Sequence, residues 1–213
     1  MISKGLLIFP QWLVTSALES PKEDYGIRIL GDVIDAVAPQ IELRAQFPHD
    51  QILEKPEQVL MPGFVDAHTH LYGLLAHGIP LMKAPEGFMP FLEDFWWPLV
   101  ENQLDVELIK AATAWNCSQM IASGITSFYD CTEAPHALPG VLLAQAEVVE
   151  EWGLRGILSF EATERISREN GELGLAENLA MIARGREQKG LVQGLHAVVT
   201  LETLEHCPAC TEG

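Results

Sequence analysis

The chain has 213 residues, 48% of them hydrophobic and 20% charged, which is enough for one large or two smaller globular domains. It carries 30 acidic against 13 basic residues, a formal net charge of −17. Such a charge repels phosphate backbones and anionic lipid headgroups, so we expect neither nucleic acid nor a membrane as a partner. The sequence contains no apolar run of about 18 residues, the length that a membrane-spanning helix requires.

The first part of the chain, residues 1–60, predicts a small β domain. Its apolar stretch 5–14 follows a single basic residue and is interrupted by Pro10, which favours a short edge strand over a signal peptide. Two apolar-rich runs flank the turn pair Gly31-Asp32, a pattern typical of a β-hairpin.

From residue 61 onward, predicted strands alternate with predicted helices. Four strands are expected to end near residues 70, 130, 160 and 199, with helices between them at 105–123, 138–152 and 172–187. Such alternation indicates an α/β fold with a parallel sheet. The pattern alone fits either the first half of a (β/α)8 barrel or a small open sheet.

A long segment, 71–104, separates the first of these strands from the first helix. It is rich in glycine and proline, and it contains the aromatic cluster Phe91, Phe95, Trp96 and Trp97. Loops of this length are uncommon unless they are functional. The aromatic cluster therefore predicts either a lid that excludes water from a site or a surface buried against a neighbouring subunit.

The four cysteines do not have the spacing of a disulfide scaffold, which favours a reducing, cytoplasmic location. Cys207 and Cys210 are separated by two residues and preceded by His206. A zinc knuckle would need a second pair of ligands, so we expect no metal site there.

His68 and His70 are the strongest candidates for functional residues in the sequence. Side chains two residues apart on a strand project to the same face, about 7 Å apart along the backbone. Two imidazoles that converge over this distance can hold one metal ion. If the strand belongs to a barrel, the pair lies at its C-terminal end, where the active sites of such barrels are found.

The ten residues from Met61 to His70, MPGFVDAHTH, resemble the amidohydrolase superfamily, whose first barrel strand carries a Pro-Gly-Phe-(Val/Ile)-Asp-x-His-x-His signature. The resemblance extends to the deaminases and chlorohydrolases of nucleobases and triazines, including aminohydrolases with a Phe-Trp-Trp-Pro segment like residues 95–98. It implies a small N-terminal β domain over 1–60. It also implies the first half of a distorted (β/α)8 barrel over 61–213, truncated after its fourth strand.

The same resemblance implies that His68 and His70 bind a catalytic metal, with zinc as the default and iron or manganese as alternatives. In the family, two further histidines and an aspartate follow strands 5, 6 and 8. These ligands and the general base are expected beyond residue 213, so we expect the 213-residue chain alone to be inactive. Some branches of the family use a carboxylated lysine on the fourth strand to bridge two metal ions. The predicted fourth strand here, 191–199, has no lysine, which argues against those branches.

Four residues are expected to contact a small-molecule substrate. His196 matches a substrate-contacting histidine of the family, although a core histidine bonded to a backbone carbonyl is the alternative. Glu161 and Arg165 follow the third strand at the end where barrels bind substrates, or they form a solvated salt bridge. His77 follows the metal pair and is either a substrate contact or simply exposed. Asp130, at the end of the second strand, either orients the site or caps the turn.

The sequence therefore predicts a metal-dependent amidohydrolase that hydrolyses a carbon–nitrogen bond other than a peptide bond, such as the deamination of a nucleobase-like or amidine substrate. The metal would lower the pKa of a water molecule towards ~7 and so provide a nucleophile at neutral pH. We expect a homo-oligomer. The alternative function is an inactive half-barrel that serves an assembly, because four strands leave two open sheet edges.

Overall fold

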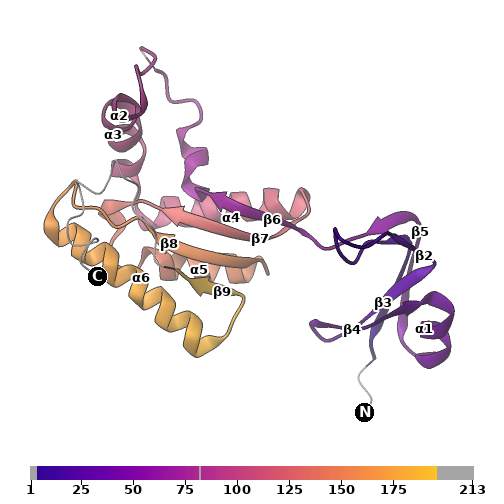
Figure 1. The fold of residues 1–213 in the computed structure, drawn as a ribbon. Helices are drawn as coiled ribbons and strands as arrows, with labels where there is room; N and C mark the ends of the chain where they lie inside the picture. The colour runs from indigo at the N-terminus through magenta and orange to yellow at the C-terminus, as the bar shows by residue number, and fades with distance from the viewer. Residues whose placement is uncertain (1–3, 82, 196–213) are drawn as a thin grey trace. The chain divides into compact units, whose positions relative to one another are not determined.

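The computed structural model describes residues 4–81 and 83–195, so His196, the end of the predicted fourth strand and the Cys207–Cys210 segment lie outside the described residues. The chain divides into two compact units, residues 1–63 and 64–213. Figure 1 shows a small β-sheet with one short helix in the first unit, and an α/β arrangement in the second. Among the described residues, no helix has the length and apolar character needed to cross a membrane.

The first unit is a five-stranded sheet with one short helix. Its elements are β1 (Leu6–Leu13), β2 (Lys22–Glu23), β3 (Tyr25–Leu30), β4 (Val33–Pro39), α1 (Gln40–Gln46) and β5 (Gln51–Leu60). The predicted hairpin is confirmed: β3 and β4 pair antiparallel, and Gly31 at the turn has a φ of +65° that favours glycine.

The position of β1 corrects the prediction of an edge strand. β1 pairs antiparallel with β2 and β3 and parallel with β5, so it lies inside the sheet. Its central place explains why Leu7 and Phe9 are buried, where they pack with Leu43 of α1. Neither the helix nor the parallel partner was predicted, because both depend on contacts made by residues far along the chain.

The second unit confirms the alternation of strands and helices. Its parallel sheet has the order β6-β7-β8-β9, formed by β6 (Phe64–Thr69), β7 (Ile125–Thr132), β8 (Arg155–Phe160) and β9 (Val192–Gly194). The long helices are α4 (Val106–Ala122), α5 (Val141–Glu151) and α6 (Arg168–Gln188). Asp105 caps α4 as predicted, because its side chain accepts a hydrogen bond of 2.8 Å from the Leu108 backbone N–H.

The two faces of this sheet differ in what covers them. Phe128, Leu158 and Phe160 are buried in the core that the helices share with the sheet. The alternate positions point the other way, and there Val65 is 68% exposed and Ile157 is 41% exposed. The helix-covered face stabilises the unit, whereas the opposite face carries open apolar surface.

The segment 71–104 is not the loop that the sequence suggested. It contains the 3-10 helices η1 (Leu71–Ala76) and η3 (Glu101–Gln103), the α-helical turns α2 (Phe88–Phe91) and α3 (Trp97–Leu99), and the π-helix η2 (Leu92–Trp96). A further 3-10 turn, η4 (Pro135–Ala137), follows β7. The sequence did not predict these short helices, because each spans fewer residues than an amphipathic repeat needs and the segment is rich in glycine and proline.

Candidate metal centre

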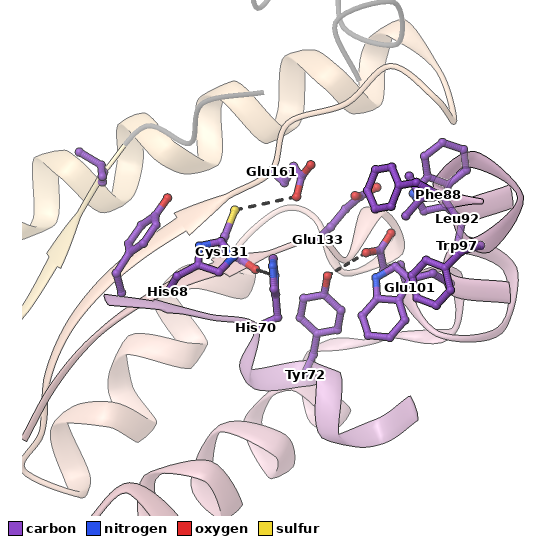
Figure 2. Close-up of a pocket in the computed structure, with 14 residues that line it drawn as sticks. His68, His70, Tyr72, Phe88, Leu92, Trp97, Glu101, Cys131, Glu133 and Glu161 are labelled. Atoms are coloured by element: carbon purple, nitrogen blue, oxygen red, sulfur yellow. Dashed lines mark hydrogen bonds between the residues drawn. The ribbon is translucent and has the colours of Figure 1, made fainter. Parts of the chain in front are cut away.

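His68 and His70 come from the C-terminal end of β6 and face the same cavity. The cavity has a volume of about 710 Å³, and both imidazoles line it. Their ring centroids lie 5.0 Å apart with the planes at 85° (Figure 2). His70 follows the last strand residue, but its backbone is still extended, so the two-residue periodicity holds through it. The prediction that the two rings point together is confirmed, while metal binding stays a prediction.

The ring of His70 is held by one hydrogen bond that decides its tautomer. Its Nδ1 atom lies 2.6 Å from the backbone carbonyl oxygen of Cys131. A carbonyl oxygen only accepts, so this contact requires the proton on Nδ1 and leaves Nε2 as the ring nitrogen available to a metal ion. Metal-binding histidines typically donate their second N–H in this way.

Two histidines with this orientation fit a zinc-type ion, which accepts imidazole nitrogen readily. A catalytic zinc site usually has three protein ligands. Within residues 4–81 and 83–195, no group of three or more His, Cys, Asp or Glu side chains is arranged to hold a metal ion. The described residues therefore offer two imidazole nitrogens to such a centre.

Glu161 lies beside this pair, one residue after β8, and lines the cavity. Burial is the main reason that the pKa of its carboxyl is raised above 4.5, and the neighbouring His70, Arg165 and His68 oppose the shift. The Sγ atom of Cys131 lies 4.0 Å from the Glu161 carboxylate. Glu161 thus places a partly desolvated carboxyl next to the two imidazoles.

A second group of buried charges surrounds Arg165. Its guanidinium pairs with Glu133, and it also reaches Glu101 at 3.2 Å and the side-chain oxygen of Asn102 at 2.7 Å. The Tyr72 hydroxyl donates a hydrogen bond of 2.8 Å to Glu101 (Figure 2). The Glu101 and Glu133 side chains are 3% and 4% exposed. Two carboxyls that line the cavity therefore share one buried cation.

Burial is the largest influence on the ionisation of these two carboxyls. The pKa of Glu133 is raised well above its ordinary value of 4.5, mainly by burial and then by the charge of Glu101. Burial also raises the pKa of Glu101, although Tyr72 and Arg165 act in the opposite direction. One cation therefore does not fully compensate two desolvated carboxylates.

These shifts predict how the stability of the chain depends on pH. With a raised pKa, the folded chain keeps a proton that the unfolded chain has already released. The contribution of these carboxyls to the free energy of unfolding therefore falls as the pH rises from about 4.5 through the raised values. Glu133→Gln removes one such proton, so denaturation between pH 4 and 8 should show a weaker decline in the variant. A wild-type chain that gains stability relative to Glu133→Gln over this range would contradict the account.

An aromatic wall, formed by Phe91, Trp96 and Trp97, lines the cavity beside the charged groups. Phe91 and Trp96 are stacked, with centroids 5.5 Å apart and planes at 28°, and Trp96 lies 6.0 Å from the Tyr72 ring. The Trp97 ring lies 5.0 Å from the Arg165 guanidinium carbon. These three aromatic side chains therefore pack within their own unit and shape the cavity.

Of the four residues predicted to contact substrate, the structure places only some at the cavity. Glu161 lines the cavity, whereas Arg165 is not among the lining residues and lies buried behind Glu101 and Glu133. The alternative of a solvated salt bridge is wrong for Arg165, whose side chain is 5% exposed. His77 is exposed at the end of η1 and is not among the lining residues. His196 lies outside the described residues.

The sequence reasoning missed several cavity residues. Tyr129, Cys131 and Glu133 occupy alternate positions along and just beyond β7, and all three line the cavity. The two-residue period, counted from the end of the predicted strand, would have identified them. Tyr72 and Glu101 gave no such signal, because short helices bring them to the cavity.

The sequence model of the amidohydrolase family matches residues 59–206. The chain belongs to this family. It is 31% identical over 188 residues to a 5-methylthioadenosine/S-adenosylhomocysteine deaminase of Desulfitobacterium hafniense, covering 84% of this chain and 39% of the relative. It is 32% identical over 108 residues to a deaminase of the same name from Syntrophus aciditrophicus, covering 51% of this chain and 24% of that relative. The chain thus spans less than half the length of these curated relatives.

Solved structures of two deaminases share the fold. An adenosine deaminase from Xanthomonas campestris with bound zinc has a TM-score of 0.76 and 22% identity, covering 97% of this chain and 46% of that one. A guanine deaminase from C. acetobutylicum with bound guanine has a TM-score of 0.74 and 15% identity, covering 91% and 46%. At these identities the likeness concerns the arrangement of strands and helices.

Proposed function

We propose that this chain is the metal-binding first half of a (β/α)8 hydrolase that removes an amino group from a nitrogen heterocycle. The observation that carries the proposal is the His68–His70 pair, whose rings face one cavity while the Nδ1 atom of His70 contacts the Cys131 carbonyl. Deaminases among the curated relatives and a zinc-bound adenosine deaminase among the solved structures support this choice. We propose zinc as the metal, with iron or manganese as the alternatives.

In this proposal the residues of the chain have separate tasks. His68 and His70 hold the metal, which when bound would lower the pKa of a water molecule towards ~7. The Glu161 carboxyl stays beside them to exchange hydrogen bonds with the reacting end of the substrate. The aromatic wall, with Phe91 and Trp96 stacked, excludes water from a planar ring.

At the other end of the cavity, Glu101 and Glu133 accept hydrogen bonds from donors on the substrate. Arg165 acts through them, because its guanidinium holds both carboxyls. This replaces the sequence-based prediction of a direct contact for Arg165. Substrate contacts by His77 and His196, a homo-oligomeric state and a cytoplasmic location stay predictions.

One observation favours a second candidate, a half-barrel that is inactive and serves an assembly. The sheet face opposite the helices carries exposed apolar side chains, Val65 and Ile157 among them. Open apolar surface of this kind invites association. Zinc content separates the candidates, since an assembly chain has no need for the metal.

Ammonia release tests the proposed function. A chain that continues through all eight barrel strands is loaded with zinc and offered adenosine-type nucleosides, guanine and an aminotriazine, with a chelator-treated sample as the control. We expect zinc-dependent ammonia release from at least one class, and none from the 213-residue chain alone. Release that survives complete removal of the metal, or none from any substrate, would refute the proposal.

A further inference from the structure

A buried aspartate lies directly behind the predicted metal ligand His70. Asp130 lies in β7, two residues before the strand ends, is 0% exposed and belongs to the face of the strand that packs against the helices. Its Oδ1 atom accepts a hydrogen bond of 2.7 Å from the backbone N–H of Leu71. This N–H belongs to the peptide group that joins His70 to Leu71, so Asp130 is hydrogen-bonded to the backbone next to the predicted metal ligand His70.

The Leu71 N–H has no other regular partner in the described part of the chain. The register between β6 and β7 shifts between Asp66 and Thr69, so the regular ladder ends just before His70. Leu71 is the first residue of η1, and the first N–H groups of a helix have no partner within it. The Asp130 carboxylate supplies the acceptor that neither the sheet nor the helix provides.

The carboxylate is itself fixed by two further donors. The Thr132 hydroxyl donates to its Oδ2 atom at 2.7 Å, and the Gln145 side-chain amide donates to the same atom at 2.8 Å. Gln145 belongs to α5 and is 1% exposed. The two oxygens of a carboxyl group have enough lone pairs to accept from all three donors. The packing of α5 on the sheet therefore determines where the acceptor for Leu71 lies.

We propose that Asp130 is a positioning residue for the metal centre. Through the Leu71 peptide it sets the direction of the His70 side chain, while the carbonyl of the next residue, Cys131, fixes the ring tautomer. Adjacent residues of β7 thus hold the ligand at its backbone and at its ring. The effect on metal binding rests on the proposed function, whereas the effect on the ring geometry does not. Losing an outer partner of a metal ligand typically costs about 10–100-fold in metal affinity.

The test uses the 213-residue chain with two variants. Asp130→Ala removes all three acceptor contacts. Asp130→Asn keeps the size but sets an amide N–H2 group against the Thr132 and Gln145 donors, so the side chain must turn. Long-range 1H–15N spectra of 15N-histidine-labelled chain report the His70 tautomer without metal, and zinc titration reports the affinity. We expect wild-type His70 to have its proton on Nδ1, and both variants to mix the tautomers and bind zinc about 10–100-fold more weakly.

Asn178→Ala is the matched control. Asn178 is also fully buried, and its side chain bonds the backbone of Phe160 on the next strand at 2.7 Å and 2.8 Å without touching His70. We expect a comparable loss of thermal stability but an unchanged His70 tautomer and zinc affinity. An unchanged tautomer in both Asp130 variants, or an equal shift in Asn178→Ala, would overturn the inference. If wild-type chain binds no zinc, the proposed function fails, and the tautomer comparison still decides the role of Asp130.

Discussion

Replacing either histidine of the metal pair by alanine is expected to lower the zinc affinity of the chain by at least about 100-fold. Loss of an outer partner already costs about 10–100-fold, so loss of a direct nitrogen ligand should exceed that range. Among the described residues, His68 and His70 are the histidines that line the cavity, and their rings lie close together. In a chain that spans all eight strands, the same variants should abolish ammonia release.

His136→Ala is the control for this prediction, because His136 is exposed on η4 and is not among the residues that line the cavity. Zinc affinity is measured by competition with a chromophoric chelator, on variants whose circular dichroism matches the wild type. Equal affinity in wild type, His68→Ala and His70→Ala would show that zinc binds elsewhere.

The second large effect is expected from Arg165→Met. This change removes the cation from between Glu101 and Glu133, whose side chains are nearly inaccessible to water. Breaking a buried ion pair by removing one partner typically costs about 3–5 kcal/mol of stability. The loss should shrink at acid pH, because protonated carboxyls no longer need the cation. Urea denaturation at pH 5 and pH 8 measures both effects.

Arg168→Met provides the comparison for the same substitution. Arg168 forms an exposed ion pair with Glu172, with side chains 78% and 59% exposed, so little change in stability is expected. If Arg165→Met is no more destabilising than Arg168→Met at pH 8, the buried cluster does not stabilise the cavity as described.

Local patterns in the sequence predicted most of the second unit. The helix at α4 was predicted from its Asp105 cap and from Gly124 after its end, and the structure confirms both positions. The start of α6 was missed by a few residues, although Ser167 caps it with a hydrogen bond of 3.1 Å from the Asn170 N–H. Caps and apolar periodicity are local, and so a single sequence reveals them.

Long-range pairing was less predictable. The central place of β1 depends on its parallel pairing with β5, which begins 45 residues after β1 does, at Gln51 against Leu6. The strand's own residues fit an edge or a centre equally well. The candidate site likewise contains residues that local spacing predicted and residues that it did not. The two-residue spacing revealed His68 and His70, whereas Glu101 and Tyr72 reach the cavity only through the folding of segment 71–104.

Anomalous diffraction at the zinc edge tests the central claim most directly. Crystals of the protein grown with zinc are measured above and below the edge, so that a difference map shows zinc alone. We predict one strong peak within about 2.0–2.1 Å of a ring nitrogen of His68 and of the Nε2 atom of His70. A map with no peak at these rings, or a peak bonded to the Nδ1 atom of His70, would contradict the account.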